Sequence, residues 1–137
     1  MRTLPAAATT QSLALLRCGL ALLLFIHGCT RIGKGDVAGF GEFLTGSGLP
    51  FGLGIAWFVS LFELICAPLM ALGRWLVTPI ALVFAAIYAC GIWLVHAKEG
   101  WFVVGGGRNG VEYSVLILFC LLALAWAHRG DLSGQRK

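Results

Sequence analysis

Leu49–Gly73 reads LPFGLGIAWFVSLFELICAPLMALG, and Glu63 is the only charged side chain in this stretch. A helix crosses a bilayer with roughly 20 apolar residues, so the run is long enough to span a membrane. A carboxylate inside such a span is costly and faces a protein interior or a water-filled cavity, where it marks a functional site. The stretch therefore predicts a membrane-spanning helix with a functional glutamate.

The composition is that of an integral membrane protein. Of the 137 residues, 59% are hydrophobic and 12% are charged, and the mean hydropathy is +0.90, whereas about 25% of the residues of a soluble domain are charged. The net charge of +4 comes from Lys and Arg near the ends of apolar runs, a pattern that anchors helix ends and contacts lipid headgroups. We expect the lipid bilayer as a partner, no nucleic acid, and no soluble catalytic domain within these 137 residues.

Four apolar segments predict four spans, at about 12–30, 50–72, 75–96 and 111–128. Unpaired strand edges do not occur in lipid, and the alternating pattern of a membrane barrel is absent. The sequence thus predicts an all-α fold, an integral membrane four-helix bundle that forms one domain over residues 1–137. A lipoprotein signal ending at Cys29 is the alternative for the first segment; since three more segments follow, we expect this helix to be retained.

The basic residues predict a multi-pass protein of the cell inner (plasma) membrane with both termini in the cytoplasm. In this orientation six basic residues lie inside, namely Arg2, Arg17, Arg74, Arg129, Arg136 and Lys137, and four lie outside, namely Arg31, Lys34, Lys98 and Arg108. The five cysteines contain no C-x-x-C pair, which argues against a thiol redox site. The four that lie inside apolar runs, all except Cys29, are interpreted as packing residues.

The two longer connections each allow two interpretations. Arg31–Pro50 contains GFGEFLTGSG, which is either a short interfacial helix or a glycine-rich connector. Ala97–Gly110 contains VVGGGRNG, whose backbone N–H groups form either an anion nest or an ordinary turn.

Small residues in the second span indicate the direction in which Glu63 points. They recur at intervals of three or four and form one stripe with the glutamate: Gly52, Ala56, Ser60, Glu63, Ala67 and Ala71. Because small residues allow close helix contacts in membranes, this stripe is predicted to face another helix. Pro68, one turn beyond Glu63, is expected to kink the helix and to free the carbonyl of Leu64.

Two histidines and two carboxylates are predicted to meet near the outer membrane face. With alternating helix directions, the outer ends of three spans carry a polar residue and Glu63 lies somewhat deeper, so the predicted outer-leaflet pocket contains His27, Glu63, His96 and Glu112. These residue types bind a divalent metal or relay protons to a quinone-like ligand. The alternative is a buried hydrogen-bond network in which Arg31 or Arg108 neutralises a carboxylate.

These residues carry a resemblance to a known family. The pair His27-Gly28 with Arg31, the glutamate at position 63 and the motif Gly110-Val111-Glu112-Tyr113 resemble the DoxX family of small four-helix membrane proteins. The tail Arg129–Ser133 also resembles the end of the sequences of this family. Arg31 stands where a lysine is common, and Gly134 stands where an aspartate often occurs.

The resemblance implies a role beside other proteins. Members are associated with quinone-linked respiratory oxidation as small subunits, with oxidative-stress membrane complexes and with operons that respond to metals or redox stress. We therefore expect an accessory subunit of a redox-linked or stress-response complex, with redox partner subunits or further copies of itself as partners and a divalent metal or a quinone as ligand. The candidate pocket residues are His27, Arg31, Glu63, His96, Arg108, Glu112 and Tyr113, and the candidate metal ligands are His27, Glu63, His96 and Glu112. A scaffold or assembly factor without its own ligand is the first alternative, and a small-molecule transporter is the second.

Overall fold

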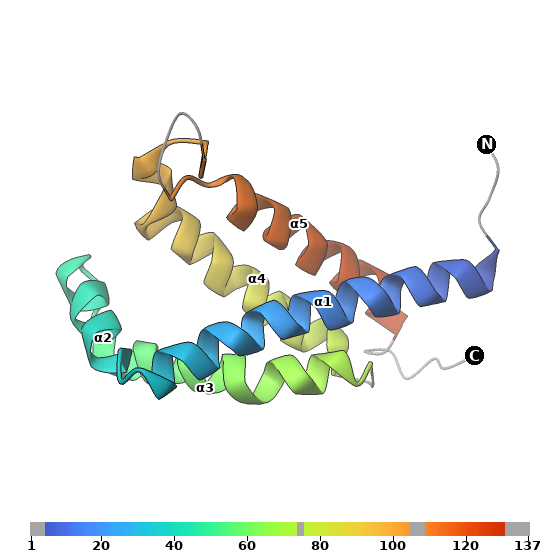
Figure 1. The fold of residues 1–137 in the computed structure, drawn as a ribbon, viewed down its shortest axis with the longest axis horizontal. Helices are drawn as coiled ribbons and strands as arrows, with labels where there is room; N and C mark the ends of the chain where they lie inside the picture. Colours follow the sequence, from blue (N-terminus) through green and yellow to red (C-terminus); the bar gives the residue numbers. More distant parts are fainter. Residues whose placement is uncertain (1–4, 74–75, 105–108, 131–137) are drawn as a thin grey trace. The chain divides into compact units, whose positions relative to one another are not determined.

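The computed structural model describes residues 5–73, 76–104 and 109–130. All regular elements in these ranges are helical: α1 (Ala6–Gly33), α2 (Val37–Gly46), α3 (Gly52–Ala71), α4 (Val77–Leu94), the 3-10 helix η1 (His96–Glu99) and α5 (Glu112–Ala127) (Figure 1). The prediction of an all-α fold is confirmed. The chain divides into two compact units, Met1–Val77 and Thr78–Lys137, which are described in turn.

Three helices are long and apolar enough to cross a membrane, namely α1, α3 and α4, whereas the apolar α5 is shorter, with 16 residues. The four helices α1, α3, α4 and α5 lie at the four predicted apolar segments. Their bounds differ most at the first segment, where α1 begins at Ala6 rather than near residue 12. The alanine-rich start favours helix, and at 28 residues α1 is about 42 Å long. Three of the four predicted spans are confirmed as helices that are long and apolar enough to cross a membrane; the fourth span and the packing of four spans into a single bundle stay predictions.

In the first unit, α1 and α3 pack against each other as antiparallel helices. Near one end Arg17 Nε donates to the carbonyl of Ala71 at 3.3 Å, and further along Gly28 lies against α3. A Cβ at Gly28 would come within 2.9 Å of Glu63 Cβ and 3.0 Å of the Ser60 carbonyl. Only glycine allows this approach without a shift.

Five members of the small-residue stripe of α3 are buried as predicted, namely Gly52, Ala56, Ser60, Glu63 and Ala67, whereas Ala71 at the end of the helix is partly exposed. α3 continues through Pro68 to its end at Ala71.

The connection between α1 and α3 contains a helix, α2, so the helical interpretation of this segment is confirmed. Figure 1 shows α2 at the start of α3, where its buried residues are Val37, Gly41 and Leu44. A Cβ on Gly41 would lie 2.7 Å from Leu53 Cα, so α2 is packed closely on α3. The position of α2 at the membrane interface stays a prediction.

In the second unit, α4 and α5 form an antiparallel pair that is linked at both ends. Thr78 Oγ1, at the start of α4, donates to the carbonyl of Ala125 near the end of α5 at 3.4 Å. At the opposite end, the backbone N–H groups of Val111 and Glu112 donate to the carbonyls of Gly100 and Trp101, each at 3.1 Å. These bonds close the connection between the two helices.

Candidate functional site

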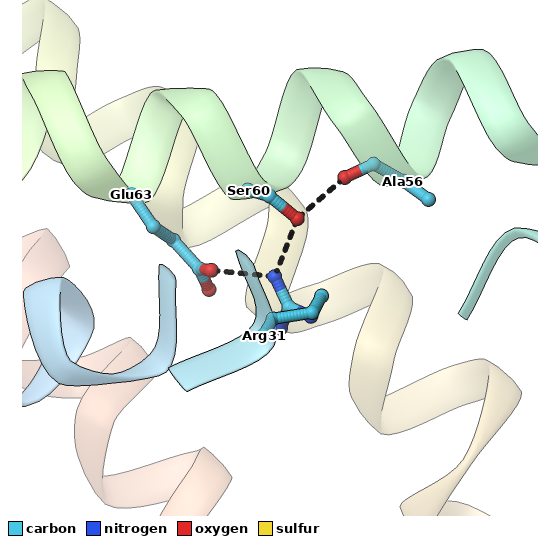
Figure 2. A network of polar contacts seen from close by, with 4 residues as sticks. All are labelled: Arg31, Ala56, Ser60 and Glu63. Atoms are coloured by element: carbon cyan, nitrogen blue, oxygen red, sulfur yellow. Dashed lines mark hydrogen bonds and ion pairs between the residues drawn. The ribbon is translucent and has the colours of Figure 1, made fainter. Parts of the chain in front are cut away.

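An ion pair between α1 and α3 forms the centre of the site (Figure 2). Arg31 Nη1 donates to Glu63 Oε2 at 2.7 Å and to Ser60 Oγ at 3.1 Å, and the Ser60 hydroxyl donates to the carbonyl of Ala56 at 2.7 Å. The side chains of Arg31 and Glu63 are 16% and 6% exposed. The predicted alternative in which Arg31 neutralises a carboxylate matches this contact.

The pair lies near the middle of α3. Glu63 is about 16 Å from Gly52 and about 12 Å from Ala71 along the helix axis, at 1.5 Å per residue. A lone carboxylate at that depth is strongly unfavourable, since moving a charge out of water costs several kcal/mol. The cation of Arg31 is therefore the feature that lets a glutamate remain in this span.

α2 supplies a third contact to the same guanidinium. The Cζ atom of Arg31 lies 4.6 Å from the ring centroid of Phe40, a distance at which the ring face attracts the cation. All three helices of the first unit thus converge on one side chain. Phe40 was not predicted to be part of the site, and its only signal in the sequence was its place in the segment that follows Arg31.

An open pocket of about 440 Å³ lies beside the ion pair, and its lining residues are His27, Thr30, Arg31, Asp36, Gly39 and Phe40. This volume is within the usual range of small-molecule sites, about 300–1,000 Å³. His27 and Arg31 lie one turn apart on α1 and both line this pocket. Thr30 and Asp36 were not predicted; Thr30 lies one turn after His27 on the same helix, a spacing that could have identified it.

The guanidinium of Arg31 retains unused donors. Among the described residues, only its Nη1 atom has a hydrogen-bond partner, and no buried side-chain nitrogen or oxygen there lacks one. The Nε and Nη2 atoms are therefore accessible, and Arg31 lines the pocket. Together they form the side-on edge of the guanidinium, which binds two acceptor oxygens of one group.

The other predicted pocket residues belong to the second unit. His96 Nδ1 lies 2.6 Å from the carbonyl oxygen of Asn109, and Glu112 Oε1 accepts the N–H of Val103 at 3.1 Å. Tyr113 is exposed, and Arg108 lies outside the described residues. In this unit His96 and Glu112 thus contact the backbone of the connection between α4 and α5.

Close backbone packing at position 110 requires a glycine. A Cβ at this position would come within 2.5 Å of the carbonyl oxygens of Trp101 and Phe102. The motif of residues 110–113 thus contributes a close backbone approach at Gly110 and a backbone contact at Glu112.

The structure brings His27, Arg31 and Glu63 together in one unit, and it places His96 and Glu112 in the other. A single pocket made from all four predicted metal ligands stays a prediction. Within residues 5–73, 76–104 and 109–130, no three His, Cys, Asp or Glu side chains are grouped so as to hold a metal ion.

Comparison with known proteins gives one match, to the DoxX family over residues 12–97. This range is well over half of the chain, and it includes the Arg31–Glu63 pair, His27 and His96. No curated protein and no solved structure gives a significant match. On the extent of the family match, the chain belongs to the DoxX family.

Proposed function

We propose that the protein is an accessory subunit of a redox-linked or stress-response complex in the membrane, and that it binds a ligand in the pocket between α1 and α2. The observation that carries the proposal is the Arg31–Glu63 pair, which lies in the middle of an apolar span and has a free guanidinium edge beside a pocket. Ionisable groups inside membrane spans generally mark such sites.

The donor set favours a ligand head group that accepts hydrogen bonds. Arg31 offers Nε and Nη2, and His27 adds a titratable imidazole to the same pocket. A quinone carbonyl fits these donors. A divalent cation fits less well, because Glu63 already binds Arg31 at 2.7 Å and the guanidinium charge repels a second cation.

The experiment is a thermal unfolding titration of the purified protein with a short-chain quinone and, separately, with Zn²⁺. We expect the quinone to raise Tm and the substitution His27→Ala to weaken this effect. His128→Ala is the matched control, since His128 follows α5 in the other unit. A quinone shift of equal size in both variants, or no shift in the wild type, would refute a quinone site at this pocket.

A scaffold without a ligand is the second candidate function. It is favoured by the close packing at Gly28 and by the complete hydrogen bonding of buried side chains in the described part of the chain. A scaffold predicts that His27→Ala retains partner subunits and that any defect follows the loss of folded protein. Transport ranks third, because it requires a polar path across the bilayer.

The location in the inner membrane with cytoplasmic termini belongs to the same proposal. Impermeant thiol reagents applied to intact cells should modify a cysteine introduced at Gly46, at the end of α2, and one introduced at Lys98, in η1. The five native cysteines, all free thiols, are replaced first. Protection of both positions, with labelling of the C-terminus, would invert the orientation.

A further inference from the structure

The pocket beside Arg31 contains both a cationic and an anionic group. Arg31 contributes its free Nε and Nη2 edge, and Asp36 contributes a carboxylate from the turn that precedes α2. The Asp36 side chain makes no capping bond to α2, and among the described residues it has no hydrogen-bond or ion-pair partner. Both groups are thus available to a ligand in the same pocket.

The charge balance of the pocket decides which ligand it favours. The charge of Arg31 is already compensated by Glu63 at 2.7 Å, so the carboxylate of Asp36 gives the pocket lining and this ion pair together a net negative charge. A simple anion such as inorganic phosphate would be attracted by the guanidinium edge and repelled by Asp36. A zwitterion, with two oxygens for Arg31 and an ammonium group for Asp36, keeps both attractive contacts.

The position of the pocket indicates where such a molecule would come from. It lies between the last turns of α1 and the start of α2, and Lys34 and Asp36 in the turn between these helices are exposed charges. Exposed charged residues at the end of a span lie at the headgroup level of the bilayer. Arg31 is only five residues before Asp36, in the last turn of α1, and both residues line the same pocket.

We propose that this pocket binds a phosphoethanolamine group, with the phosphate oxygens on the Nε and Nη2 edge of Arg31 and the ammonium group on Asp36. The inference rests on the proposed function in taking the α1–α2 pocket as a ligand site. The group is available from phosphatidylethanolamine in the bilayer or from a soluble phosphoethanolamine ester. A primary ammonium donates hydrogen bonds to a carboxylate, whereas the trimethylammonium group of phosphatidylcholine does not.

The test measures lipid binding to the full-length protein in detergent by native mass spectrometry. Wild type should bind phosphatidylethanolamine about tenfold more tightly than phosphatidylcholine, the ratio expected from one charge-assisted hydrogen bond. Asp36→Asn should remove this preference, and Arg31→Lys, which keeps the charge but loses the fork, should weaken both lipids. Glu42→Gln, an exposed position on α2 outside the pocket, is the matched control and should retain the preference.

Equal binding of the two lipids by wild type, or a preference that persists in Asp36→Asn, would overturn the inference. If soluble glycerophosphoethanolamine displaces phosphatidylethanolamine from the wild type, the ligand of the pocket is a soluble ester. If it does not, the ligand is the lipid. The short-chain quinone separates this inference from the proposed function. A quinone shift that depends on His27, without any preference for phosphatidylethanolamine, refutes only the inference, whereas the reverse result refutes only the quinone site.

Discussion

Glu63 and Glu112 are both carboxylates in apolar helices, Glu63 in the middle of α3 and Glu112 at the start of α5, but they have different kinds of partner. Glu63 is buried in the middle of α3 and binds Arg31 from another helix. Glu112 begins α5, is partly exposed, and accepts a backbone N–H from Val103 nine residues earlier. A buried carboxylate needs a charged partner from elsewhere in the fold, whereas one at a helix start is satisfied locally.

The largest expected effect comes from breaking the buried pair. Arg31→Leu alone and Glu63→Leu alone each leave one uncompensated charge in the span, and each should reduce the free energy of unfolding by about 3–5 kcal/mol. The double variant removes both charges and should be considerably less destabilised than the sum of the singles. Denaturant unfolding in detergent measures all three. Additive losses would mean that the two side chains do not stabilise each other.

The second effect concerns the glycine that allows α1 to approach this pair. Gly28→Ala places a Cβ 2.9 Å from Glu63 Cβ and 3.0 Å from the Ser60 carbonyl, so we expect a loss of about 1–3 kcal/mol from overpacking. The matched control is Gly19→Ala, also in α1, where a Cβ would have no neighbour within 4 Å. The control should be neutral or stabilise the helix by about 0.5–1 kcal/mol. Equal melting temperatures for the two variants would place α1 and α3 farther apart than described.

A third comparison uses two cation–π contacts, one in each unit of the described chain. Arg31 lies 4.6 Å from the half-buried Phe40 ring in the first unit, and Arg129 lies 4.5 Å from the exposed Trp126 ring in the second. Such contacts contribute about 2 kcal/mol when desolvated and about 0.5–1 kcal/mol when exposed. Phe40→Leu should therefore lower Tm more than Trp126→Leu. The reverse order would remove α2 from the support of Arg31.

The smallest effect is expected at Glu112. Glu112→Gln keeps an acceptor oxygen for the Val103 N–H and removes only the charge, so the free energy of unfolding should fall by less than about 1 kcal/mol. Thermal unfolding of Glu112→Gln and Glu63→Gln, measured side by side, checks that the loss at Glu112 is the smaller one. A larger loss at Glu112 than at Glu63 would show that the carboxylate at the start of α5 has a partner beyond its own loop.

The helical fold was predictable because apolar runs longer than a bilayer leave the backbone no other way to satisfy its hydrogen bonds. The burial of Glu63 followed from the small-residue stripe, whose period places Ala56, Ser60 and Ala67 on one face. The basic partner of Glu63 could be predicted only as Arg31 or Arg108, because sequence spacing does not show which of the two connections packs against this span. The contact of Phe40 with Arg31 depends on how α2 packs on α3, which no periodicity in a ten-residue helix determines.

If His27 and Arg31 act as one ligand site beside Glu63, their contributions to binding must be coupled. A double-mutant cycle measures this coupling, with His27→Ala, Arg31→Lys and their combination titrated with whichever head group stabilises the wild type. We predict non-additive losses in binding, with a coupling energy of about 0.5–3 kcal/mol. Strictly additive losses that follow the fall in Tm would mean that His27 and Arg31 share no ligand, and the Arg31–Glu63 pair would then be a structural contact.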